Sequence, residues 1–171
     1  MFGGGQTPPG APAMVVGSTT TAGSMEDKLK PKILVAISLN AGRRILHPLA
    51  GEFDLHYCRS AVETHAPLAS GMDAVVCGIN FDGGRLFDFL ARLRNDPAGR
   101  VLPFICLRQY AESPHLLHAV EMIRHAVEVG GGSFIDVSRL RATGGDAVAS
   151  AALRGAILDA LATARPASHA G

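Results

Sequence analysis

The chain has 171 residues, of which 47% are hydrophobic and 18% charged, and its formal net charge is +1. This length suits a single domain, and the apolar content is high enough for a core, which excludes global disorder. The near-neutral charge gives no sign of a protein that binds nucleic acid or an anionic membrane.

The first part of the chain has a different composition from the rest. Residues 1–24 contain no charged side chain and are rich in glycine, proline, serine and threonine. Such a segment cannot bury enough surface to offset its chain entropy, so we expect residues 1–30 to be disordered. Met25 is followed by Glu26, Asp27 and Lys28, and one hypothesis is that translation begins at Met25. We place the folded domain at residues 31–165 and a frayed tail at residues 166–171.

From Lys32 onward, apolar segments of strand length alternate with segments of helical periodicity. The predicted strands are 33–37, 53–58, 74–79, 102–107 and 133–137. The predicted helices are 41–49, 61–70, one capped by Asp82 that ends near Asp96, one from Pro114 to the glycines at 130–132, and 146–164. Short strands joined by helices pair in parallel through right-handed crossovers. The sequence therefore predicts an α/β fold with three layers, a doubly wound five-stranded parallel sheet of flavodoxin-like order 2-1-3-4-5.

The same segments resemble a known family. Lys32-Ile33-Leu34-Val35, the ungapped segment from Asp73 to Arg94, Leu102 to Leu107, and Ala126 to Ile135 resemble the CheY-like receiver domain of response regulators. In that family an acidic pair after the first strand holds magnesium, an aspartate ending the third strand accepts a phosphoryl group, and a threonine or serine and a lysine follow the fourth and fifth strands.

The residues at these positions differ from the family's residues in every case. The acidic pair corresponds to Ile37 and Ser38, the phosphoacceptor to Gly78, the hydroxyl residue to Arg108 and the lysine to Val137. No lysine occurs after Lys32, so a shifted alignment cannot supply one. Because magnesium needs gathered oxygen ligands and phosphoryl transfer needs that ion and a cation, we expect a pseudo-receiver without phosphorylation chemistry or enzymatic activity.

The resemblance implies a regulatory module of signal transduction that acts by binding another signalling protein. We expect the contact surface on the fourth helix, the fifth strand and the last helix, around His118, Met122, His125, Ser138 and Leu153. No DNA-binding or catalytic segment follows the last helix, so we expect the output to lie in a partner. A homodimer through the same surface is a further expectation, because symmetric dimers are common.

A competing hypothesis is a protein that binds a small ligand or a nucleotide. Its site would be the crevice at the carboxyl ends of the strands, near Ser38, Asn80, Asp82 and Arg108, where a glycine in place of the phosphoacceptor would open space. A third hypothesis is a decayed domain with only a structural role.

Other patterns favour ordinary structural roles. His118, Glu121 and His125 share a helical face, which we interpret as a solvated stripe rather than half of a metal site. Cys77 and Cys106 lie in apolar strands and are expected to be inert, reduced thiols. No apolar run approaches the ~20 residues that a membrane helix needs. We therefore expect a cytoplasmic protein with no metal, no cofactor and no contact with nucleic acid or membrane.

Overall fold

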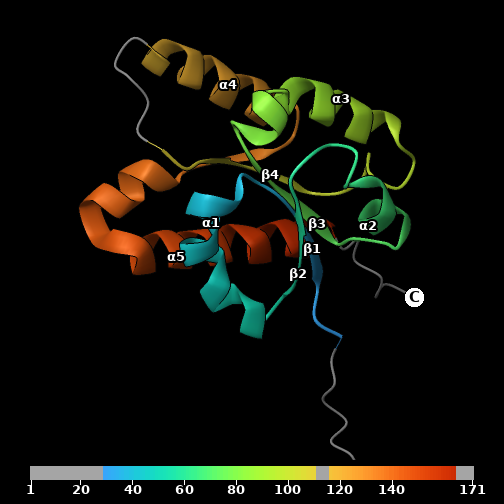
Figure 1. Ribbon diagram of the computed structural model, residues 1–171, viewed down its shortest axis with the longest axis horizontal. Coiled ribbons are helices and arrows are strands. Elements are labelled where there is room, and N and C mark those ends of the chain that lie inside the picture. Colours follow the sequence, from blue (N-terminus) through green and yellow to red (C-terminus); the bar gives the residue numbers. More distant parts are fainter. Residues whose placement is uncertain (1–28, 111–115, 165–171) are drawn as a thin grey trace, which may run out of the picture.

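A computed structural model describes residues 29–110 and 116–164, and the expectations for residues 1–28 and for the tail from residue 165 lie outside the described residues. One parallel sheet has the strand order β2-β1-β3-β4-β5, which confirms the predicted fold (Figure 1). The strands are β1 (Lys32–Ala36), β2 (Asp54–Cys58), β3 (Ala74–Gly78), β4 (Phe104–Arg108) and β5 (Ser133–Asp136). The helices are α1 (Leu39–Leu46), α2 (His65–Ala69), α3 (Leu86–Asn95), α4 (Leu117–Val129) and α5 (Val137–Ala164), with short 3-10 turns η1 (His47–Gly51) and η2 (Phe81–Gly83).

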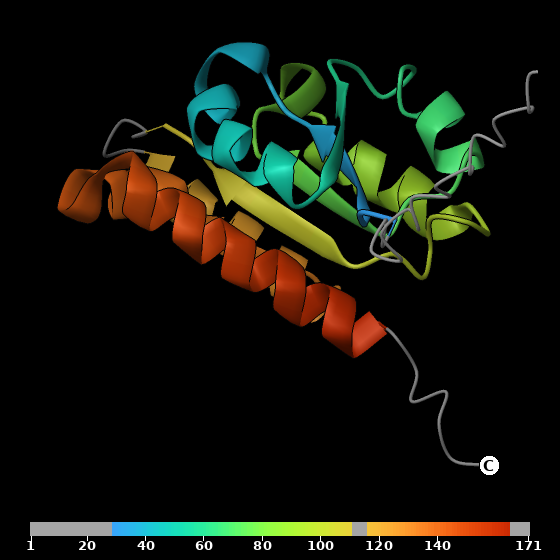
Figure 2. The ribbon, with the colours of Figure 1, turned by 90° about the horizontal axis from the view of Figure 1, so that it is seen from below.

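The apolar strands are buried because helices cover both faces of the sheet. Leu34 and Ala36 of β1 belong to a core shared with α2, α3 and α4, whereas Ile33 and Val35 belong to a core shared with α1 and α5. Figure 1 shows α3 and α4 on the side of the sheet opposite α5, and Figure 2 shows α5 lying along the sheet. The continuous apolar runs in the sequence are therefore strands buried on both faces.

Several of the predicted helix starts are wrong, including that of α2, which begins at His65 rather than at residue 61. Asp82 lies inside η2 with a φ of 51°, and α3 begins after Arg85, so Asp82 does not cap it. Val137 does not end the last strand, because the chain turns directly from Asp136 into α5. The predicted helix 146–164 is thus the second part of a longer element, which Gly145 interrupts with φ 76° and ψ −173°. The predicted start of α4 at Pro114 lies outside the described residues, and its end before Gly130 is confirmed.

Helix α5 also qualifies the expectation about membranes. Among the described residues, it is the one helix long and apolar enough to cross a membrane by length and composition, with a mean hydropathy of 1.4 in its most apolar window. In the structure its residues Ala149, Leu153 and Ile157 are fully buried against the sheet.

Candidate functional site

The candidate site lies at the edge of the sheet where the strands end. The register pairs Ala36 with Cys77, Gly78 with Leu107, and Arg108 with Asp136. The residues that end β1, β3, β4 and β5 therefore meet at one edge, which is where parallel sheets of this type bind ligands.

Gly78 does not open a space in this edge, so the premise of the ligand-binding hypothesis was wrong. A Cβ atom placed on Gly78 would lie 3.0 Å from Oε1 of Gln109 and 3.5 Å from Cγ2 of Ile37. Ile37 is 1% exposed, and Val137 is fully buried in the same core as Ile37. The pocket that an acidic cluster would need is filled by aliphatic side chains and one amide.

Arg108 takes part in a structural ion pair. Its Nη1 donates to Oδ2 of Asp136 over 2.9 Å, and the two side chains are only 11% and 27% exposed. The other carboxylate oxygen of Asp136 accepts a hydrogen bond from the backbone N–H of Arg139 in the first turn of α5. The pair therefore joins the ends of β4 and β5 to the start of α5, while Nε of Arg108 is buried without a hydrogen-bond partner among the described residues.

The other three crevice residues have separate surroundings. Ser38 and Asn80 are exposed at the ends of β1 and β3. Asp82 is half-buried and accepts a hydrogen bond of 3.4 Å from the backbone N–H of Ala61, in the loop between β2 and α2. Asp82 is thus tied to the loop between β2 and α2, whereas Arg108 is tied to the end of β5, and these contacts do not point to a shared ligand.

Gln109 is the residue of this site that the sequence analysis missed. It follows the last residue of β4, yet it is only 5% exposed, and its Nε2 is buried without a hydrogen-bond partner among the described residues. Its amide contacts the positions of Gly78 and of Gly42 on α1. A polar residue directly after a strand suggests an exposed loop, so the sequence carries no signal for this burial.

The predicted partner surface is largely exposed, with one correction. His118, Met122 and His125 are exposed on α4, with Met122 62% exposed, and Ser138 is half-buried. Leu153 is fully buried and belongs to the core, because it lies on the face of α5 that packs against the sheet. Its place on the predicted surface was therefore wrong.

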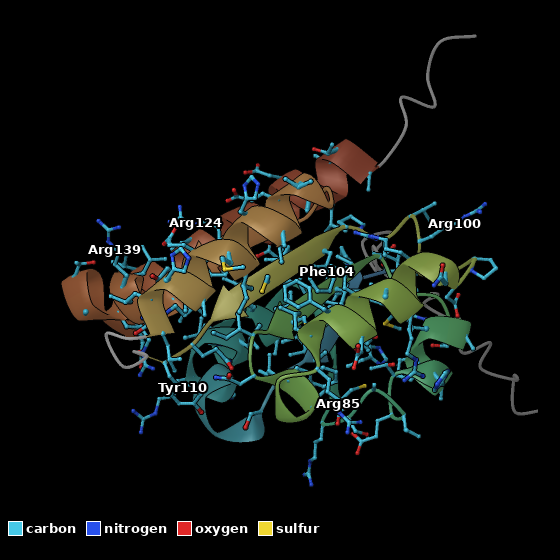
Figure 3. All side chains as sticks on the ribbon, turned by 90° about the horizontal axis from the view of Figure 1, so that it is seen from above. Arg85, Arg100, Phe104, Tyr110, Arg124 and Arg139 are labelled. Atoms are coloured by element: carbon cyan, nitrogen blue, oxygen red, sulfur yellow. The ribbon has the colours of Figure 1, made fainter. Side chains whose placement is uncertain are left out.

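Two charged side chains of α4 form a local ion pair. Arg124 donates to both carboxylate oxygens of Glu121, at 2.7 and 2.8 Å, so Glu121 is engaged by an arginine of its own helix. Figure 3 shows Arg124 and Arg139 at the same end of the molecule, on α4 and on the first part of α5. We define the partner face as the exposed side chains of α4 together with the edge of β5 and the first turns of α5.

The two central thiols are adjacent and buried. Cys77 and Cys106 are paired residues of β3 and β4, and both are fully buried. Burial raises the pKa of the Cys106 thiol to about 12. Burial, and then the neighbouring Cys106, raise the pKa of the Cys77 thiol well above its ordinary value. A thiol that stays protonated is a poor nucleophile and a poor metal ligand, so the geometry favours an inert role.

Known structures share this fold. No family model matches the sequence, and no curated protein sequence is similar enough to count as a relative. The phosphorylated response regulator RcpA of a cyanobacterial phytochrome has a TM-score of 0.55 and 18% identity, over 81% of this chain and 99% of that chain. The receiver domain of a histidine kinase from Syntrophus aciditrophicus has a TM-score of 0.54 and 16% identity, over 82% and 97% of the chains. The receiver domain of an HD domain-containing protein from Pseudomonas fluorescens has a TM-score of 0.53 and 21% identity, over 78% and 91% of the chains. At these identities the similarity establishes that this chain has the CheY-like receiver fold.

Proposed function

We propose that this chain is a receiver-like regulatory module of cytoplasmic signal transduction that works without phosphorylation and without enzymatic activity of its own. It would act by binding another signalling protein through the partner face. The observation that carries the proposal is the filled edge of the sheet, where Ile37, Gly78 and Val137 replace the groups that a phosphoryl transfer to a carboxylate requires.

The chemistry of the edge supports the first half of the proposal. A divalent cation needs several oxygen ligands gathered at one point. Ile37 and Val137 offer no oxygen ligand in their side chains, and Gly78 has no side chain. The nearby carboxylates of Asp82 and Asp136 are engaged by backbone N–H groups, and Asp136 is also engaged by Arg108.

The first prediction concerns phosphorylation. Incubation of the protein with acetyl phosphate and Mg²⁺ should give no phosphate adduct in the intact mass, and beryllofluoride with Mg²⁺ should leave the melting temperature unchanged. A receiver with a complete acidic site serves as the positive control under the same conditions. A covalent phosphate on any aspartate of this chain would refute the proposal.

The second prediction concerns the partner face. Met122 on α4 is 62% exposed, and Phe87 on α3, outside that face, is 48% exposed. The Met122→Arg variant should bind a specific partner with an affinity at least about tenfold lower than the wild type, because a charged side chain at the centre of a packed contact disrupts it. The matched Phe87→Arg variant should keep that partner, and both variants should keep the native melting temperature.

The measurement compares proteins retained from an extract of the native organism by the wild type and by the two variants. Analytical ultracentrifugation over a range of concentrations tests whether the retained partner is a second copy. If Met122→Arg retains everything that Phe87→Arg retains, the partner face is wrongly placed.

A further inference from the structure

Two glycines from different elements contact the same buried side chain at the candidate site. A Cβ atom on Gly78 would lie 3.0 Å from Oε1 of Gln109, and a Cβ atom on Gly42 would lie 2.8 Å from Nε2 of the same residue. The Gly42 position would also clash with Cδ1 of Ile37. The amide of Gln109 is therefore held between β3 and α1 at positions where both neighbours lack a side chain.

A side chain on the glycine in α1 would be opposed by Ile37 as well as by Gln109. Gly42 is buried within Leu39–Leu46, and glycine is less favourable than alanine in the interior of a helix. No left-handed backbone conformation requires glycine at either position, since neither Gly42 nor Gly78 has a φ in that region. What both positions share is the space taken by Gln109, together with Ile37.

The filling side chain is polar at its buried tip. Nε2 of Gln109 is buried and lacks a hydrogen-bond partner among the described residues, and an unpaired buried amide is unfavourable. An apolar side chain would fill the same volume without burying an amide. The polar tip of Gln109 instead lies 3.0 Å from the point where a side chain on residue 78 would begin.

We propose that Gln109 is a specificity-determining residue that closes this pocket against divalent cations. Its amide occupies the space into which a carboxylate on residue 78 would project. Rotating the Gln109 amide by half a turn exchanges its oxygen and nitrogen, but either atom still occupies the space next to residue 78. This inference rests on the proposed absence of phosphorylation chemistry, and it adds that replacing Gly78 by an acidic residue is not sufficient to restore a cation site.

The first test is a double-mutant cycle on thermal stability. Gly78→Ala should lower the melting temperature, because the new methyl group would lie 3.0 Å from Oε1 of Gln109 and that amide must shift by a few tenths of an ångström. In the Gln109→Ala variant, the same substitution should lower the melting temperature by at most half as much, because the amide atoms that oppose the new methyl group are absent. Gly51→Ala is the matched control, because a Cβ atom there meets nothing within 4 Å. Equal losses in the two backgrounds would refute the contact.

The second test reopens the pocket. Ser38 is exposed, so Ser38→Asp and Gly78→Asp together place two carboxylates at the ends of β1 and β3. Millimolar Mg²⁺ should raise the melting temperature of the variant that also carries Gln109→Ala, and it should not raise that of the variant with native Gln109. Sodium chloride of equal ionic strength is the control. An equal response of both variants, or no response by either, would overturn the role given to Gln109.

The two tests also separate this inference from the proposed function. If acetyl phosphate modifies the native chain, the proposed function fails whatever the cycle shows. If the native chain stays unmodified but the cycle is additive, the proposed function stands and Gln109 has no part in closing the pocket.

Discussion

At the scale of single residues, the buried thiol of Cys106 makes stability depend on pH. Its pKa is raised by burial from the ordinary value of 9.0 to about 12, so the folded chain holds a proton that the unfolded chain releases. Above pH 9 and up to about pH 12 the folded state therefore binds more protons. The free energy of unfolding must fall over this window as the pH rises.

We expect this thiol to contribute a slope of roughly 1 kcal/mol per pH unit. Urea unfolding under reducing conditions between pH 8.5 and 10.5 measures it, and the Cys106→Ala variant, although less stable throughout, should show a shallower slope. Native Cys77 and Cys106 should also resist iodoacetamide at pH 8, whereas all three cysteines should react in denaturant. Parallel slopes for the wild type and Cys106→Ala would argue against a buried, protonated thiol.

At the scale of elements, two glycines of α5 should respond oppositely to alanine. Gly145 has φ 76° and ψ −173°, a conformation that side-chain-bearing residues rarely adopt, so Gly145→Ala should destabilise the fold by about 1–3 kcal/mol. Gly155 lies within the regular part of the helix and a Cβ atom there meets nothing within 4 Å, so Gly155→Ala should stabilise by about 0.5–1 kcal/mol. Chemical denaturation of both variants measures the pair, and a loss of stability in Gly155→Ala would contradict the contact-free environment.

The elements themselves were largely predictable, because buried parallel strands appear as short apolar runs. The order of the sheet follows from the crossover rule once five strands alternate with helices. The junction at Val137 was not predictable, since an apolar residue after a strand suits either a longer strand or the first turn of a packed helix. Asp82 was misplaced because its capping signal is the same whether the helix begins there or after Arg85.

The candidate site was predictable only in part. The alignment places Ile37 and Gly78 at one edge of the sheet, and the paired strands confirm that the residues ending β1 and β3 meet there. The burial of Gln109 depends on two glycines distant in sequence, which only the folded chain brings together. Leu153 shows the same limit, because the buried face of α5 is set by how the helix docks on the sheet.

At the scale of the whole molecule, α5 closes one side of the sheet and is held there by polar as well as apolar contacts. The buried hydroxyl of Ser150 donates to the backbone oxygen of Ile45 in α1 over 2.8 Å. Arg154 donates to both carboxylate oxygens of Glu52, at 2.6 and 2.8 Å. These contacts orient the helix on the sheet. By length and apolar composition alone, α5 could be either a core helix or a membrane span, and its contacts with α1 and Glu52 favour the core helix.

If α5 is a core helix rather than a membrane span, a charged side chain should be tolerated on its exposed face but not on its buried face. Leu153 is fully buried and Val148 is 45% exposed. In a helix of the core, Leu153→Asp should abolish cooperative folding, because an unpaired buried carboxylate and a lost apolar side chain together cost several kcal/mol, comparable to the stability of a whole domain. Val148→Asp should change the free energy of unfolding by less than about 0.5 kcal/mol, as exposed substitutions usually do.

Circular dichroism with thermal melting compares the two variants. Flotation with phosphatidylcholine vesicles should leave the wild type in the vesicle-free fraction. Recovery of the wild type with the vesicles, together with unimpaired folding of Leu153→Asp, would contradict the packing of α5 on the sheet and the expectation that this chain does not bind membranes.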